Sequence, residues 1–217
     1  MEWEGLTSRQ RKLCRCAAFW LGCVLVTVSL GCHRGPTAIR PPKIDSARAA
    51  DAAIEQYDQD ADGLLSEAEL AACPGILGQL GKYDQDQDRR VSAAEIAARI
   101  RQWQDRDIGL RAFSCGVSFQ GRPLLGAQVR LTPEAFLGEN LKSASGTVAD
   151  FGQAVIRIAP AELPEDQKDI PGVQLGLYKV HITHPTVELP ARYNTETTLG
   201  VEIGEGASKT PVVFALK

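Results

Sequence analysis

The fold of the first half of this chain is decided by the stretch Asp58-Gln59-Asp60-Ala61-Asp62-Gly63-Leu64-Leu65-Ser66-Glu67-Ala68-Glu69. It places carboxylates at the first, third, fifth and twelfth positions, a glycine at the sixth and a hydroxyl at the ninth. Carboxylates at alternate positions converge only if the chain turns sharply between them, and Gly63 accepts the backbone that such a turn needs. The expected ligands of a hard cation are Asp58, Asp60, Asp62, Ser66, Glu69 and the backbone carbonyl of Leu64.

This spacing is that of an EF-hand calcium loop, in which the last residue, Glu69, binds the ion through both carboxylate oxygens. Ca²⁺ is therefore the expected cofactor. Leu65 is apolar at the eighth position, as expected of a residue that pairs with a second loop in a short two-stranded ribbon. The alternative interpretation is a solvated acidic turn without a metal.

A second copy of the pattern follows at an offset of 84 − 58 = 26 residues. Its expected ligands are Asp84, Asp86, Asp88, Ser92, Glu95 and the backbone carbonyl of Arg90. Arg89 stands at the sixth position and must adopt the left-handed conformation that glycine accepts freely, at a cost of about 1 kcal/mol or more. Arg90 adds a second positive charge beside the cation. We therefore expect the second site to bind calcium more weakly than the first.

Helical patterns flank both loops. Ser46 is a candidate N-cap for a helix that runs to about Tyr57, and Ser66 with Glu69 forms a capping-box pattern at the start of the next helix. Pro74-Gly75 is expected to end that helix early. The apolar positions of the later helices are Ile76, Leu77, Leu80, Tyr83, Ile96, Ile100 and Trp103. They predict a shared core, with an exposed target-binding groove as the alternative.

The N-terminus has the pattern of an export signal. Four basic residues precede an uncharged apolar run of about 15 residues, Cys16–Leu30, which is shorter than the ~20 residues of a membrane-spanning helix. Ser29-Leu30-Gly31-Cys32 resembles a bacterial lipobox, and that resemblance implies a signal peptide over 1–31, a lipid on Cys32 and a tether over 32–46. Ordinary secretion and a retained signal anchor are the alternatives. Each of the three predicts an exported protein of the cell envelope, facing the periplasm or the cell surface.

Two of the six cysteines, Cys73 and Cys115, lie beyond the expected signal and its cleavage site. In an oxidising compartment they predict a disulfide that closes a loop of about 40 residues and stabilises the fold by about 3 kcal/mol or more. Two buried free thiols are the alternative.

The balance of charge is mildly acidic. The whole chain has a formal net charge of −3, and removal of 1–31 leaves 24 − 4 = 20 basic against 27 − 2 = 25 acidic side chains. Much of this excess lies in the two loops, and no basic patch is present in the sequence. We therefore expect no nucleic-acid partner.

The second half alternates apolar and polar residues between turns that contain Gly or Pro. The predicted strands are centred on Val117, Val129, Ile156, Val180, Val201 and Phe214. Short strands at this density predict a β-sandwich. The expected fold class is α+β, with a signal over 1–31, a tether over 32–46, a helical EF-hand pair over 47–107 and an all-β sandwich over 108–217.

Four segments of this half resemble carboxypeptidase regulatory-like, transthyretin-like domains. They are Gly121-Arg122-Pro123-Leu124-Leu125-Gly126-Ala127-Gln128-Val129-Arg130-Leu131, Ala149-Asp150-Phe151-Gly152-Gln153-Ala154, Gly176-Leu177-Tyr178-Lys179-Val180 and Pro190-Ala191-Arg192-Tyr193-Asn194, which runs into Thr197-Thr198-Leu199. The resemblance covers residues 113–217 and implies a seven-stranded prealbumin-like sandwich without catalysis of its own. The segments 133–146 and 160–171 are longer than a minimal sandwich needs and are candidate contact surfaces.

The sequence offers little support for an enzyme. His181 and His184, with Glu188 nearby, have a spacing that places residues of a strand on opposite faces, so that strand-end histidines are the simpler interpretation. The expected function is that of a membrane-tethered, calcium-binding lipoprotein with a structural or interaction role and an unidentified protein or glycan partner. The alternative is a calcium-dependent interaction module used in the manner of dockerins, although dockerin loops usually end in aspartate and these end in Glu69 and Glu95.

Overall fold

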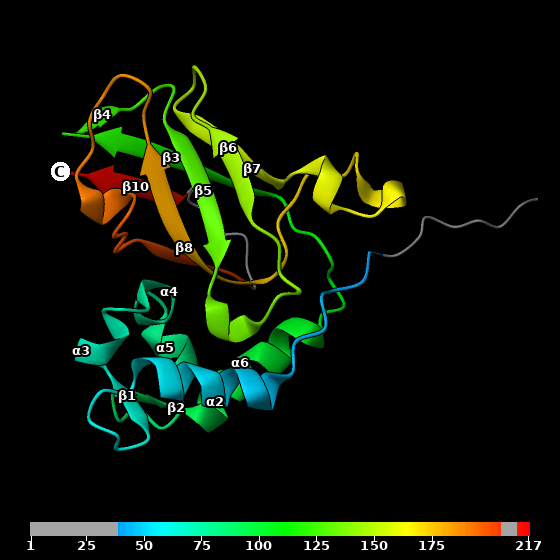
Figure 1. Ribbon diagram of the computed structural model, residues 1–217, viewed down its shortest axis with the longest axis vertical. Coiled ribbons are helices and arrows are strands. Elements are labelled where there is room, and N and C mark those ends of the chain that lie inside the picture. The colour runs from blue at the N-terminus through cyan, green and yellow to red at the C-terminus, as the bar shows by residue number, and fades with distance from the viewer. Residues whose placement is uncertain (1–38, 205–211) are drawn as a thin grey trace, which may run out of the picture. The chain divides into compact units, whose positions relative to one another are not determined.

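A curled, mostly antiparallel β-sheet and a set of helices make up the structure, a computed structural model that describes residues 39–204 and 212–217 (Figure 1). The protein is thus of mixed α+β class with a sandwich-like β part. The expected signal, the lipidation site Cys32 and the tether up to residue 38 lie outside the described residues. Among the described residues, no helix is both long enough and apolar enough to cross a membrane.

The helices occupy the first half of the described chain. Their bounds are α2 Ser46–Tyr57, α3 Glu67–Leu70, α4 Pro74–Leu77, α5 Leu80–Tyr83 and α6 Ala93–Gln104. The expected cap of α2 was wrong by one residue, because the side chain of Asp45 accepts the hydrogen bond from the Arg48 amide and Ser46 is the first helical residue. The capping box of Ser66 and Glu69 is confirmed.

The strands of the sheet lie in the second half. Their bounds are β3 Phe113–Phe119, β4 Arg122–Pro123, β5 Gln128–Pro133, β6 Ala144–Thr147, β7 Gln153–Ile158, β8 Gly176–Thr183, β9 Gly200–Ile203 and β10 Val212–Leu216. The order is β10-β3-β7-β6-β5-β8-β9, with β4 beside β3. The pair β10 and β3 is parallel, and the other pairs are antiparallel.

All six predicted strands are present, but no pattern in the sequence predicted β6. This strand lies largely inside the segment 133–146 that was expected to be an insertion. The same segment holds a 3₁₀ turn, Ala135–Leu137, whose Phe136 ring packs edge-on against the Tyr57 ring of α2 at a centroid distance of 6.2 Å. The segment thus acts as a contact surface, within the protein itself, between the helices and the sheet.

Helix α4 lies directly on the sheet through two glycines. A Cβ atom on Gly200 of β9 would come within 2.4 Å of the Gly75 backbone nitrogen, and one on Gly75 would come within 2.9 Å of the Leu177 side chain. The backbones approach this closely only because neither residue has a side chain. One hydrophobic core contains residues from both sides of the expected boundary near residue 107, and the described residues form one compact unit.

The expected disulfide between Cys73 and Cys115 is not present. Both residues are free, buried thiols, which was the alternative interpretation. The Cys73 Sγ donates instead to the Glu134 carboxylate at 3.6 Å, and burial raises the pKa of the Cys115 thiol to about 12. Neither thiol has the lowered pKa that makes a cysteine reactive.

Candidate metal centre

A short two-stranded ribbon joins the two acidic loops, the first loop (residues 58–69) and the second loop (residues 84–95). Strand β1, Leu64–Ser66, pairs with β2, Arg90–Ser92, and Leu65 lies opposite Val91. Both side chains are fully buried. The predicted ribbon and its register are therefore confirmed, and the ribbon holds the two loops side by side.

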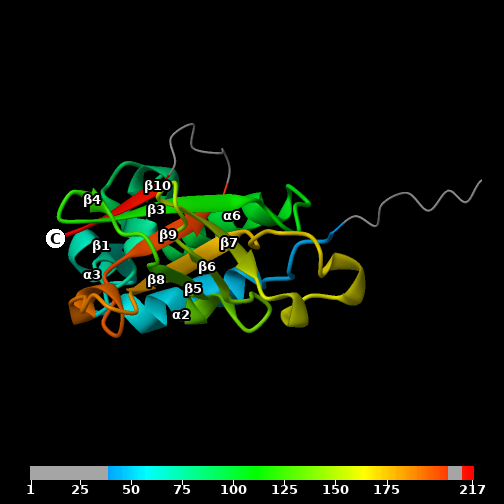
Figure 2. The ribbon, with the colours of Figure 1, turned by 90° about the horizontal axis from the view of Figure 1, so that it is seen from above.

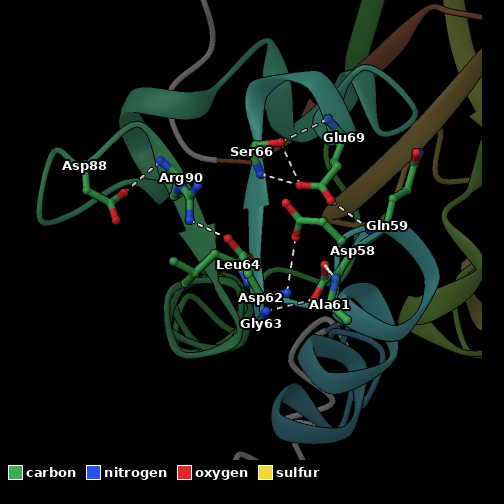
Figure 3. Close-up of polar contacts among 11 residues, drawn as sticks. Asp58, Gln59, Ala61, Asp62, Gly63, Leu64, Ser66, Glu69, Asp88 and Arg90 are labelled. Carbon is green, nitrogen blue, oxygen red and sulfur yellow. Dashed lines mark hydrogen bonds and ion pairs between the residues drawn. The ribbon is translucent and has the colours of Figure 1, made fainter.

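Backbone amides organise the carboxylates of the first loop (Figure 3). Asp58 accepts from the amide of Ala61 at 2.7 Å and from that of Gly63 at 2.9 Å. Asp62 accepts from the amide of Leu64 at 2.9 Å. These bonds wrap the chain around the Asp58 carboxylate.

Glu69 closes the first loop from the far side. One of its carboxylate oxygens accepts from the Gln59 amide at 2.7 Å, and the other accepts from the Ser66 amide at 2.8 Å and the Ser66 hydroxyl at 2.7 Å. The hydroxyl bond first, and then the two backbone amides, lower the pKa of Glu69 to about 2. The carboxylate is ionised at neutral pH, as a metal ligand must be.

The second loop repeats most of this geometry, except that Asp84 accepts from the fifth residue of its loop where Asp58 accepts from the fourth. Asp84 accepts from the amides of Asp88 and Arg89, and Glu95 accepts from the amide of Gln85 and from the amide and hydroxyl of Ser92. Arg89 has a φ of 67°, against 83° for Gly63 at the same position of the first loop. The prediction that Arg89 must take the left-handed conformation is confirmed.

Both arginines of the second loop form ion pairs with acidic residues of the first loop. Arg90 forms an ion pair with Asp62 at 2.5 Å, and Arg89 forms one with Glu67 at 2.7 Å. The Arg90 side chain therefore reaches across to the first loop. Its charge lies at a predicted ligand of the first loop, because the antiparallel ribbon brings residue 90 opposite residue 66.

The carboxylates gather into two groups. In the first loop Asp58, Asp60 and Glu69 each have an oxygen within 4.8 Å of the others, and in the second loop Asp84, Asp86 and Asp88 do so. Asp62 and Glu95 are outside these groups. The donors are all oxygens, which suits a hard divalent cation such as calcium and does not suit zinc or copper.

The charge within the second group is costly without a metal. A backbone bond from Asp88 favours the ionised form of Asp86, but desolvation and the charges of Asp88, Glu95 and Asp84 together raise its pKa. A bound cation would remove this repulsion.

A buried polar cluster ties the helix that enters the first loop to the sheet. Tyr57 immediately precedes Asp58, and its hydroxyl donates to the Glu134 carboxylate at 2.8 Å. Glu134 is 1% exposed, and Lys179 of β8 lies 3.7 Å from it. Desolvation raises the pKa of Glu134, although hydrogen bonds from Tyr57 and Cys73 and the charge of Lys179 oppose this change.

We expect Glu134→Gln to change how stability depends on pH. Folding raises the pKa of this carboxyl above its ordinary value of 4.5. Its contribution to stability is therefore complete at a pH below 4.5 and is lost as the pH rises through the raised pKa. The unfolding free energy of the variant should therefore rise relative to the native chain between acidic and neutral pH. Urea unfolding over this range measures the difference. Glu139→Gln, at an exposed position of the same segment, is the control and should follow the native profile, and parallel profiles for all three proteins would contradict the prediction.

A second buried link joins the helix that leaves the second loop to the sheet edge. Arg99 of α6 forms an ion pair with Glu202 of β9, and their side chains are 6% and 1% exposed. The guanidinium also donates to Gln102 at 2.8 Å. The buried Tyr83 lies near this pair. Burial first, and then the charge of Glu202, raise the pKa of the Tyr83 hydroxyl.

The two histidines do not converge. His181 Nδ1 lies 2.7 Å from the Asn194 carbonyl, whereas His184 Nε2 lies 2.9 Å from the Leu125 carbonyl and its Nδ1 accepts from the amides of Thr186 and Val187. Both are bonded to loops at the strand end, as the simpler interpretation predicted. Comparison of the chain with protein-family models, with curated proteins and with solved structures gave no match.

Proposed function

We propose that this chain is a calcium-binding protein in which an EF-hand pair, residues 47–107, is joined to a prealbumin-like β-sandwich. The observation that carries the proposal is the convergence of three carboxylate oxygens in each of two loops of identical spacing. The twelve-residue spacing, the closing glutamates and the connecting ribbon all match the requirements of calcium. The role is one of structure or binding, without catalysis.

The ions serve a structural purpose in this proposal. Tyr57 lies one residue before the first ligand of the first loop and bonds to Glu134, and Arg99 lies one helical turn after Glu95 and pairs with Glu202. Order imposed on the loops by calcium therefore extends to helices that are fixed to the sheet. Extracellular modules bind calcium at about 10⁻⁴ to 10⁻³ M, so an exported protein of this kind is normally loaded.

Export and anchoring are the second part of the proposal. The basic and apolar N-terminus and the lipobox-like residues before Cys32 favour a lipid-anchored protein outside the cytoplasm. Fractionation of bacteria that express the full chain or Cys32→Ser tests this part. Membrane association of the native chain and its loss in the variant are expected, and equal distribution of the two would refute the anchor.

Calcium titration by calorimetry, with thermal unfolding in calcium and in chelator, tests the central proposal. Two binding events are expected. Calcium at ten times Kd stabilises by about 1.4 kcal/mol per site, so the melting temperature should rise by roughly 5 to 10 °C.

The double variant Glu69→Gln/Glu95→Gln is the matched control and should lose most of this rise, and magnesium at the same concentration should give less. Absence of binding would remove the proposal. Binding at micromolar calcium would replace the structural role with that of a switch.

A further inference from the structure

A groove of about 590 Å³ lies on the outer face of the sheet, away from the acidic loops. Its floor is formed by β6, β5 and β8, which lie side by side in both Figure 1 and Figure 2. Its wall is the turn at Asn194 and Thr195. No residue of the two acidic loops lines the groove.

The strand register places six polar side chains on this floor in two rows. Arg130 of β5 lies opposite His181 of β8 and Ser145 of β6, and these three form the first row. The second row consists of Thr183, Gln128 and Thr147. Neighbouring strands are about 4.8 Å apart, so each row presents hydrogen-bonding groups at short, regular intervals.

The charge on this floor is positive and uncompensated. Arg130 is exposed, and within the described part of the chain no carboxylate forms an ion pair with it. Arg157 of β7 lies opposite Ser145 and continues the first row by one strand. A guanidinium offers a planar fork of donors that matches a carboxylate.

The other groups of the groove both donate and accept. The Nδ1 of His181 faces the Asn194 carbonyl, which only accepts, so Nδ1 carries the proton and Nε2 of the neutral ring is an acceptor. Serine, threonine and glutamine side chains do both. A ligand with many hydroxyl groups satisfies such a surface better than a ligand with acceptors alone.

The wall of the groove is held in place before any ligand binds. The Asn194 side chain donates to the Leu189 carbonyl at 3.2 Å and accepts from the Thr195 amide at 2.7 Å. The Thr197 hydroxyl donates to the Val180 carbonyl of β8. A fixed wall lowers the entropy that binding must overcome.

The groove is poorly suited to a peptide. β5 is paired on both sides, and β8 is paired with β9 over Gly176–Lys179. The end of β8 beyond Lys179 is bonded through His181 to the turn at Asn194, so little free edge remains for an added strand. The one apolar residue of its lining, Val129, is fully buried and offers no surface for an apolar side chain.

We propose that this groove binds an acidic saccharide, with Arg130 paired to a sugar carboxylate and the two polar rows bonded to hydroxyl groups. The lining contains no Phe, Tyr or Trp ring on which a sugar could stack, so the affinity rests on charge and hydrogen bonds. The binding affinity is therefore modest and falls as salt is added.

The test is titration of the full chain with a galacturonic acid trimer and with the neutral galactose trimer, followed by amide chemical shifts in NMR. The acidic trimer should bind more tightly, and the shifts should centre on Arg130, Ser145 and His181. Arg130→Gln should weaken binding about tenfold or more, because a charge-assisted bond is lost. Arg122→Gln removes an exposed arginine of β4 outside the groove lining and is the matched control.

Equal binding by Arg130→Gln and the native chain would overturn the proposal, provided that thermal melts show the variant to be folded. Equal binding of the two trimers would refute the proposed pairing of Arg130 with a sugar carboxylate. No binding of either trimer, or shifts produced by an acidic peptide and not by the saccharide, would refute it outright.

Discussion

Glu202→Gln is expected to lower the unfolding free energy by about 3 to 5 kcal/mol. The change keeps the shape of the side chain but leaves the Arg99 guanidinium, which is 6% exposed, without a compensating charge. The loss is large because water cannot replace the missing carboxylate at a buried position. Urea unfolding in excess calcium measures it without a contribution from metal affinity.

A surface pair provides the matched control for this substitution. Lys168 pairs with Glu165, whose side chain is 88% exposed, and Glu165→Gln should change stability by less than about 0.5 kcal/mol. Replacement of both buried partners by apolar residues, Arg99→Met with Glu202→Leu, should recover much of the lost stability. A loss below about 1 kcal/mol for Glu202→Gln would show that water reaches the pair and would weaken its role as a link between α6 and β9.

The acidic loops were predictable from sequence because their geometry is local. Spacing alone indicated the turn at Gly63, the left-handed Arg89 and the pairing of Leu65 with Val91, and all three are present. Each depends on residues within one loop or on the symmetry between two copies of it.

The links between the helices and the sheet were not predictable in the same way. Arg99 and Glu202 are 103 residues apart, and Tyr57 and Glu134 are 77 apart. Nothing in a single sequence pairs a charged helical residue with one glutamate of a distant strand. The same limit explains the failed disulfide, since two cysteines in a suitable compartment do not imply that they are neighbours.

Strand β6 was missed for a local reason. Its residues Ala144-Ser145-Gly146-Thr147 show no alternation of large apolar and polar side chains, and Ala144 is the one buried member. Gly146 must remain small because a Cβ atom there would come within 2.3 Å of the Val155 carbonyl oxygen. β6 thus forms because of its tertiary packing, although most of its residues have low strand propensity.

Glu69→Gln is expected to weaken calcium binding to the first loop roughly 100-fold, the loss of one bidentate, charged ligand. Glu69 already lies with Asp58 and Asp60 in one group of oxygens, whereas Glu95 lies outside the corresponding group of the second loop. Glu95→Gln should therefore have the smaller effect, in agreement with the glycine turn of the first loop and the left-handed Arg89 of the second.

One contact opposes the expectation that Glu69→Gln weakens calcium binding more than Glu95→Gln does. Arg90 holds Asp62 of the first loop in an ion pair, and calcium must compete with that positive charge for the carboxylate. Glu67→Gln is the control, because Glu67 occupies no ligand position and pairs with Arg89 at the surface. Calorimetric titration of the three variants decides the order: an equal loss in Glu69→Gln and Glu95→Gln would mean that the charge of Arg90 offsets the advantage that Gly63 gives to the first loop.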